Sequence, residues 1–131
     1  MKLMDIFERV STKMAVPQTR FVKLYYGCCK GTAEALEKSG FTPSPVGRKH
    51  LTLVSTPEMA KTMSEFRECD ALVEVDRIPA NYLQIDFKSH NPPKDIWEAI
   101  DRVNDGGDVI LKLSKGLGAG SFTYINKVRK K

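Results

Sequence analysis

Thiols and imidazoles are the side chains of this sequence best suited to nucleophilic or acid–base chemistry: Cys28, Cys29, Cys69, His50 and His90. The number of cysteines is odd, and adjacent cysteines seldom bridge each other because a disulfide needs well-separated backbones. No CxxC spacing occurs and the histidines stand 40 positions apart, so the pattern predicts no structural zinc site. We predict reduced cysteines with a structural role. The alternative is a reactive Cys28 or Cys29 with a lowered thiol pKa.

His50 follows two basic residues, Arg48 and Lys49, at the head of an alternating apolar stretch. A lone histidine more often has a structural role than a catalytic one, and basic neighbours favour its neutral ring. No spacing in the chain assigns a serine–histidine–acid or cysteine–histidine arrangement. The titratable residues therefore do not define a complete active site.

The glycine-rich stretch at 116–121 (GLGAGS) invites comparison with a phosphate-binding loop. It lacks the Walker spacing and terminal lysine, and it leads into a predicted strand rather than into a helix N-terminus. We interpret it as a flexible turn between two strands. Lys112 and Lys115 make it a candidate contact loop.

The net charge of +5 is distributed unevenly along the chain. Lys and Arg outnumber Asp and Glu nine to four in residues 1–50 and seven to three in residues 101–131, whereas residues 51–100 hold five against nine. A basic patch attracts phosphate-bearing partners, although a solvated surface has the same composition. The candidate nucleic-acid contacts near the C-terminus are Lys112, Lys115, Lys127, Arg129, Lys130 and Lys131. No known RNA- or DNA-binding motif accompanies them.

The length of 131 residues and the hydrophobic share of 41% fit one globular domain, residues 1–131. No stretch approaches the roughly 20 apolar residues of a membrane span. Asp5, Glu8 and Arg9 interrupt the first ten residues, which therefore do not read as a secretory signal. We expect a cytoplasmic protein that binds no metal and no membrane.

Helices and strands are predicted from apolar periodicity and from capping residues. The helices cover residues 3–14, 32–39, 56–68 and the segment between Asn91-Pro92-Pro93 and Gly106-Gly107. The first has Leu3, Ile6, Phe7, Val10 and Met14 on one face, and the third should bury Met59, Met63 and Phe66. Thr32 and Thr56 are the expected N-caps, and Gly40 an expected C-cap.

Strands are expected at residues 21–26, 50–55, 71–75, 82–87, 109–113 and 122–128. Short helices or loops separate most of them. The sequence therefore predicts an α+β fold, with a mixed, mostly antiparallel sheet and three to four helices packed on it.

Three consecutive stretches are similar in layout to the ADP-ribosyltransferase fold, including its RNA 2′-phosphotransferase branch. They are LYYGCCKGTAEALEKSGFTPS (24–44), RKHLTLVSTPEMA (48–60) and ALVEVDRIPANYLQID (71–86). The resemblance implies a cleft that binds a nucleotide such as NAD, lined by Tyr26, Gly27, Arg48, His50, Thr52 and Ser55. Arg48 is then the candidate phosphate partner.

Two departures from the family pattern bear on catalysis. The histidine of the family's first motif falls on Tyr26, and no glutamate follows Glu98 to take the place of the family's late catalytic glutamate. The resemblance therefore implies a nucleotide-binding domain with weak or absent catalysis. If it is active, the enzyme is ADP-ribosyltransferase-like or phosphotransferase-like.

Two other classes of function stay open on the sequence alone. One is a basic nucleic-acid-binding protein that uses the lysines and arginines near the C-terminus. The other is a small interaction or inhibitor protein, viral or from a mobile element. It would dock on a host protein through its acidic segment at 58–86 or through its basic pole. Such a protein needs no catalytic signature.

Overall fold

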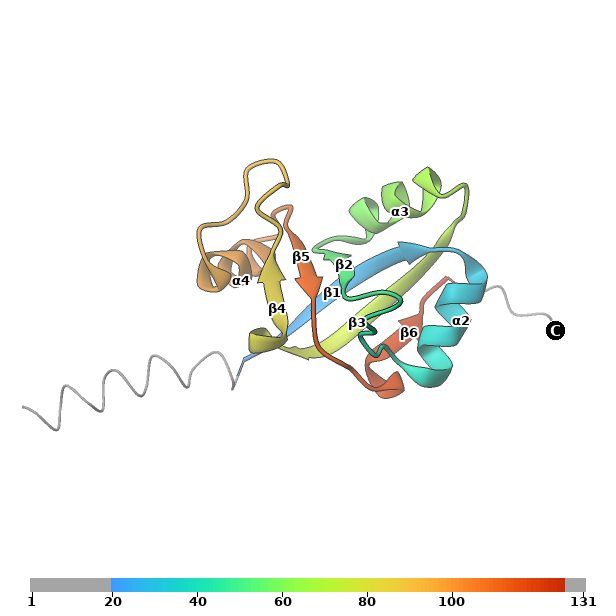
Figure 1. Cartoon of the computed structure of the whole chain (residues 1–131). Helices are drawn as coiled ribbons and strands as arrows, with labels where there is room; N and C mark the ends of the chain where they lie inside the picture. Colours follow the sequence, from blue (N-terminus) through green and yellow to red (C-terminus); the bar gives the residue numbers. More distant parts are fainter. Residues whose placement is uncertain (1–19, 127–131) are drawn as a thin grey trace, which may run out of the picture.

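The computed structural model describes residues 20–126 as a six-stranded sheet with three α-helices (Figure 1). The elements are β1 (Phe21–Cys28), α2 (Lys30–Ser39), β2 (Leu51–Val54), α3 (Pro57–Phe66), β3 (Ala71–Pro79), β4 (Leu83–Ile85), α4 (Ile96–Asn104), β5 (Ile110–Leu113) and β6 (Phe122–Tyr124). Single 3₁₀ turns at Ala80–Tyr82 and Ala119–Ser121 lead into β4 and β6. The predicted α+β class is confirmed. The helix predicted at 3–14 lies outside the described residues.

The strands lie in the order β4-β5-β2-β1-β3-β6, and every neighbouring pair is antiparallel. The two central strands, β1 and β2, share the fewest paired residues of any neighbouring strands in the sheet. β1 pairs with β3 along its whole length, from Phe21 opposite Pro79 to Cys28 opposite Ala71. It pairs with β2 only where Tyr25 lies opposite Val54. A seam therefore divides the sheet between β1 and β2.

The main core covers one face of this sheet. Alternate residues of β1 point to it, because side chains of a strand alternate between the two faces. α2 and α4 both pack on this face through small and aliphatic residues. The buried cluster takes in Leu24 and Tyr26 of β1, Leu53 of β2, Val73 of β3, Leu111 of β5, Leu36 of α2 and Ile100 of α4.

α3 packs on the opposite face, which we call the outer face. Its buried residues are Ala60 and Ser64. A methyl group on Gly27 would lie 1.8 Å from the Ala60 carbonyl oxygen and 2.7 Å from the Ser64 nitrogen. The helix backbone therefore rests directly on the strand, as small residues on both sides permit.

The expected inward face of α3 was wrong for Phe66 and partly correct for Met63, which packs against the core cluster. Phe66 is 86% exposed, and Met59 and Met63 are only partly buried. The reason is the contact at Gly27, because only Ala60 and Ser64 are small enough to let the helix approach so closely. The apolar residues that repeat at helical spacing lie on the side of α3 next to the face that contacts β1.

The capping residues were predicted with mixed success. The Thr56 hydroxyl accepts from the Met59 N–H at 3.2 Å, and Gly40 ends α2 with φ of 74°, both as predicted. Thr32 is not an N-cap, because α2 begins two residues earlier, after Cys29 in an extended conformation. α4 begins at Ile96, where the Asp95 carboxylate accepts from the Glu98 N–H at 2.9 Å.

A membrane span is not found in the described part of the chain, where no helix is both long and apolar enough to cross a bilayer.

Replacing Gly27 with alanine tests the contact between α3 and β1. We expect Gly27→Ala to lower the free energy of unfolding by about 3 kcal/mol or more, because the added methyl group overlaps backbone atoms that cannot rotate away. Gly31→Ala is the matched control. Nothing lies within 4 Å of its added methyl group, and alanine in this helical position should stabilise the fold by about 0.5–1 kcal/mol. Urea denaturation measures both, and equal stabilities of the two variants would contradict the packing of α3.

Candidate functional site

The seam between β1 and β2 brings together the residues that the sequence resemblance placed in a cleft. The two strands are neighbours, as that interpretation requires. Arg48 and His50 are exposed in the loop before β2, and Thr52 is partly exposed on the outer face. Tyr26 is buried with 1% of its surface exposed, and Gly27 is covered by α3. Only three of these five side chains are open to a ligand.

Ser55, the sixth predicted residue, has a structural role. Its hydroxyl donates to the Gly107 carbonyl at 2.7 Å and accepts from the Val109 N–H at 2.8 Å. These bonds attach the end of β2 to the connection between α4 and β5. The hydroxyl therefore has its hydrogen bonds satisfied within the protein.

Two arginines converge on the ring of Tyr26. The guanidinium carbon of Arg48 lies 5.9 Å from the ring centroid, and that of Arg67 lies 5.4 Å from it. Arg48 also donates to the Tyr26 hydroxyl, and Arg67 donates to the Gly27 carbonyl at 2.6 Å. Such positions over an aromatic face are favourable for a cation. We call Arg48 and Arg67 the arginine pair.

Neither member of the arginine pair forms a direct ion pair with a carboxylate within residues 20–126. The ion pairs found there are Lys23 with Glu74 and Arg102 with Glu98. Both guanidinium groups belong to exposed residues, and each can present further N–H donors to an anion. Two guanidinium groups without a direct ion pair, close to one ring, can attract phosphate or carboxylate groups.

Arg48 lines a separate hollow beside α2, with Leu36 and Phe41, whereas Arg67 lines an apolar groove of about 420 Å³. It lies between α3 and the strands β2 and β5, and Arg67 is part of its wall. Its lining is Val54, Met59, Thr62, Met63, Phe66, Arg67 and Ile110. A volume of this size falls within the range of small-molecule sites, which are mostly apolar with a few polar groups. Arg67 thus joins the charged and the apolar parts of one candidate site.

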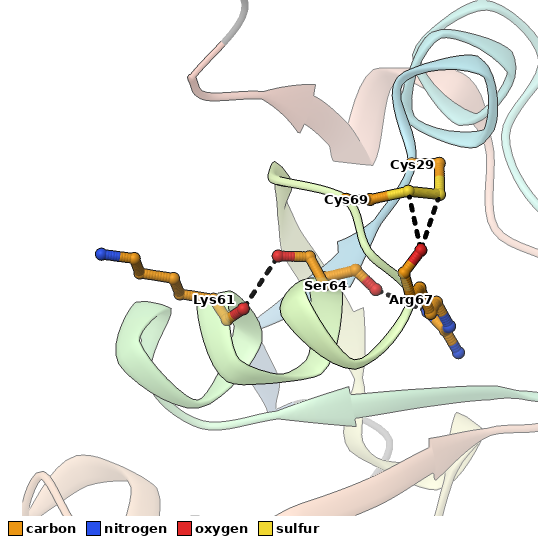
Figure 2. The surroundings of a disulfide bond; sticks show 6 residues. Cys29, Lys61, Ser64, Arg67 and Cys69 are labelled. Atoms are coloured by element: carbon orange, nitrogen blue, oxygen red, sulfur yellow. Dashed lines mark hydrogen bonds between the residues drawn. A yellow bond between two sulfur atoms is a disulfide. The ribbon is translucent and has the colours of Figure 1, made fainter.

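A disulfide between Cys29 and Cys69 holds the end of α3 beside the end of β1 (Figure 2). The two Cα atoms are 5.0 Å apart. The prediction of reduced cysteines was therefore wrong for this pair. The sequence does not show the pairing because it depends on sheet register: Cys28 lies opposite Ala71, so Cys29, one residue after β1, comes close to Cys69, two residues before Ala71.

The disulfide also fixes the backbone of Arg67. The sulfurs of Cys69 and Cys29 lie 3.2 Å and 3.9 Å from the Arg67 carbonyl oxygen, and these are close contacts because a disulfide sulfur carries no proton. Glu68 follows in the left-handed region with φ of 57°, which turns the chain from α3 toward Cys69. Disulfides are typical of oxidising compartments, so the cysteines no longer support the cytoplasmic prediction, which stays a prediction.

Cys28, the remaining cysteine, is buried and free. Burial raises the pKa of its thiol to about 11, and the charges of Arg67 and Arg48 only partly offset this. A protonated, enclosed thiol is a poor nucleophile at neutral pH. The structure therefore favours a structural role for Cys28 over a reactive one.

The remaining predicted contacts are absent from the groove lining or lie outside the described chain. Lys112 is partly exposed on the outer face of β5, and the Lys115 ammonium lies 5.6 Å from the Tyr82 ring. The GLGAGS turn joins β5 to β6, and its Leu117 exchanges two backbone hydrogen bonds of 2.9 Å with Phe41. Lys127, Arg129, Lys130 and Lys131 lie beyond residue 126. In residues 20–126 no group of His, Cys, Asp or Glu is placed to hold a metal ion.

Sequence reasoning named Arg48 but missed Arg67 and the groove. Arg67 lies 40 positions from Gly27, whose carbonyl it binds, and no local pattern links them. Comparisons with known proteins add no assignment, since scans of family models, curated proteins and solved structures each returned no match.

Reduction of the disulfide should destabilise the domain. The bridge closes a loop with a sequence separation of 40. Loss of its restriction on the unfolded chain corresponds to about 4 kcal/mol in the chain-entropy model. We expect a reductant to lower the urea midpoint of the wild type and to leave that of a Cys29→Ala/Cys69→Ala double variant unchanged. An unchanged wild-type midpoint would contradict the bridge.

Alkylation of the native protein should report the protonation of Cys28. Because its pKa is raised to about 11, iodoacetamide should modify it very slowly at pH 7 and faster as the pH rises toward 11. The free energy of unfolding should also fall as the pH rises toward 11, because the thiol ionises at a lower pH in the unfolded chain than in the folded protein. Mass spectrometry after timed alkylation measures the rate, with urea-unfolded protein as the reference. Fast native labelling at pH 7 would overturn this assignment.

Proposed function

We propose that this protein binds a nucleotide such as NAD at the arginine pair and the adjoining apolar groove, with weak or absent catalysis. The observation that carries the proposal is the position of Arg67. It contacts the Tyr26 ring beside Arg48, and it also lines the groove. A ligand there could place negative charge on the arginines and an apolar ring in the groove.

The two parts of the site match the two chemical parts of a nucleotide. Guanidinium groups bind phosphate oxygens through paired N–H donors, and the arginine pair supplies two such groups without a competing carboxylate among the described residues. Met59, Met63 and Phe66 offer polarisable and aromatic surface to a base. Thr62 adds a hydroxyl that donates to the Glu58 carbonyl at 3.2 Å and can accept from a ligand.

Weak or absent catalysis follows from the groups at hand. The resemblance to ADP-ribosyltransferases implies a histidine at position 26, where Tyr26 is buried and its hydroxyl is engaged by Arg48. The groove lining contains no carboxylate and no histidine. General acid–base catalysis needs a titratable group within hydrogen-bonding reach of the ligand. This site therefore supports binding better than it supports turnover.

Ligand-induced stabilisation tests the proposed function. A ligand that binds only the folded state raises the melting temperature, and we expect NAD and ADP each to do so. Arg67→Gln should weaken the affinity about ten- to a hundredfold, because it removes charge-assisted hydrogen bonds of about 1.5–3 kcal/mol. Lys38→Gln, which removes the same charge at the exposed end of α2, is the matched control and should bind as the wild type does.

Titration calorimetry with NAD, ADP and inorganic pyrophosphate separates the two parts of the site. Pyrophosphate should bind more weakly than ADP if the groove holds the base. The absence of any thermal shift and of any ADP-ribosylated product would overturn the proposed function. Equal losses in Arg67→Gln and Lys38→Gln would show nonspecific charge attraction and would overturn the assigned site.

A further inference from the structure

The Cys29–Cys69 disulfide constrains one short segment above all, residues 67–70 between α3 and β3, which we call the Arg67 turn (Figure 2). The sheet does not need the bridge for its register. β1 pairs with β3 along its whole length, and Cys28 already lies opposite Ala71. Opening the bridge therefore leaves the paired strands in place and acts on the turn.

Few bonds hold the Arg67 turn against the end of β1. The N–H groups of Arg67 and Cys69 both donate to the Ser64 carbonyl, at 3.0 Å and 2.9 Å, so these bonds stay within α3 and the turn. In the described part of the chain, the bonds from residues 67–69 toward β1 are the disulfide and the hydrogen bond from Arg67 to the Gly27 carbonyl at 2.6 Å. The position of Arg67 therefore depends on the bridge.

The backbone of the Arg67 turn is strained. Glu68 has φ of 57°, in the left-handed region where its Cβ atom is crowded. Helices that end in this way usually have glycine at this position. A residue keeps such a conformation only where the surrounding structure enforces it. When the bridge opens, the turn can relax to an ordinary backbone conformation and move Arg67 away from the Tyr26 ring.

The bridge is accessible in the folded protein. Cys29 and Cys69 are both partly exposed, whereas Cys28 is buried. A small dithiol can therefore reach the bridge without unfolding of the domain. Exposed disulfides of this kind are the labile ones, and regulatory disulfides belong to this class.

Reduction by a dithiol follows ordinary thiol–disulfide exchange. One thiolate of the dithiol attacks a sulfur of the bridge and displaces the other cysteine, which takes up a proton. The second thiol of the dithiol then displaces the first cysteine, and the dithiol leaves as a cyclic disulfide. Two electrons and two protons pass to the protein, which now holds two thiols in place of the bridge.

We propose that the Cys29–Cys69 bridge is a redox switch of the candidate site, and that the oxidised protein is the ligand-binding state. In this state Arg67 is held on the Tyr26 ring beside Arg48. In the reduced protein Arg67 leaves the ring, and the phosphate is left with Arg48 alone. Arg48 lies in the loop before β2, across the seam from the bridge, so the switch acts on one arginine of the pair. The proposal rests on the proposed function, because its effect is on the affinity for a nucleotide.

Nucleotide affinity in the two redox states tests the switch. We expect calorimetry to give an affinity for ADP about ten- to a hundredfold weaker after reduction with dithiothreitol, the same loss as in Arg67→Gln. In Arg67→Gln itself, reduction should cause no further loss, because the side chain that the bridge positions is already absent. Cys29→Ser/Cys69→Ser should bind as the reduced wild type does, with or without reductant. Cys28→Ala is the matched control and should keep the full response to reductant.

Hydrogen exchange separates release of the turn from loss of the fold. We expect reduction to speed the exchange of the Arg67, Glu68 and Cys69 amides by about tenfold or more, while the amides of β5 exchange as before. Equally accelerated exchange in β5 would show that reduction unfolds the domain, and this result would overturn the switch. The measurement needs no nucleotide.

The remaining outcomes distinguish the switch from the proposed function. Equal affinities for ADP in the oxidised and reduced wild type would overturn the switch and leave the proposed function standing. A loss on reduction that is as large in Arg67→Gln as in the wild type would also overturn it, because the bridge would then act elsewhere. If neither state bound ADP or NAD, the proposed function would fail, and the switch of affinity would fail with it.

Discussion

The contact between α3 and Gly27 determines most of what surrounds the candidate site. With no side chain at position 27, the helix backbone comes within contact distance of the strand, and only Ala60 and Ser64 fit between them. This approach places the C-terminal end of α3 at the end of β1. Arg67 reaches the Gly27 carbonyl and the Tyr26 ring from there. It also turns Met59, Met63 and Phe66 toward the groove.

The same approach accounts for the chemical character of the site. A helix that buries small residues leaves its larger apolar residues on the flank, where they line a groove instead of a core. A guanidinium group at its last turn then lies next to that apolar surface. The site is consequently divided between charge at one end and apolar area at the other, and no carboxylate lies in its lining. The proposed binding of a nucleotide rests on this division.

The fold could largely be predicted from sequence because its signals are local. Alternating apolar residues marked the strands, and Thr56 and Gly40 marked helix ends correctly. The candidate site could be predicted only in part, through Arg48 and the neighbouring strands. The disulfide, Arg67 and the rotation of α3 depend on register and on backbone contact between distant segments. No periodicity within one element encodes such contacts.

The narrow pairing between β1 and β2 has a mechanical consequence. Three strands, β4, β5 and β2, form one plate, and β1, β3 and β6 form another, with a single residue pair between the plates. The disulfide joins the chain after β1 to the chain before β3, so it stiffens the second plate and does not cross the seam. The Tyr25–Val54 pair is the backbone link between the plates, and side-chain packing in the core that Leu24 and Leu53 share also joins them. Arg48 precedes β2 on one plate, and Arg67 is bound to β1 on the other. A ligand bound by both arginines would therefore link the two plates.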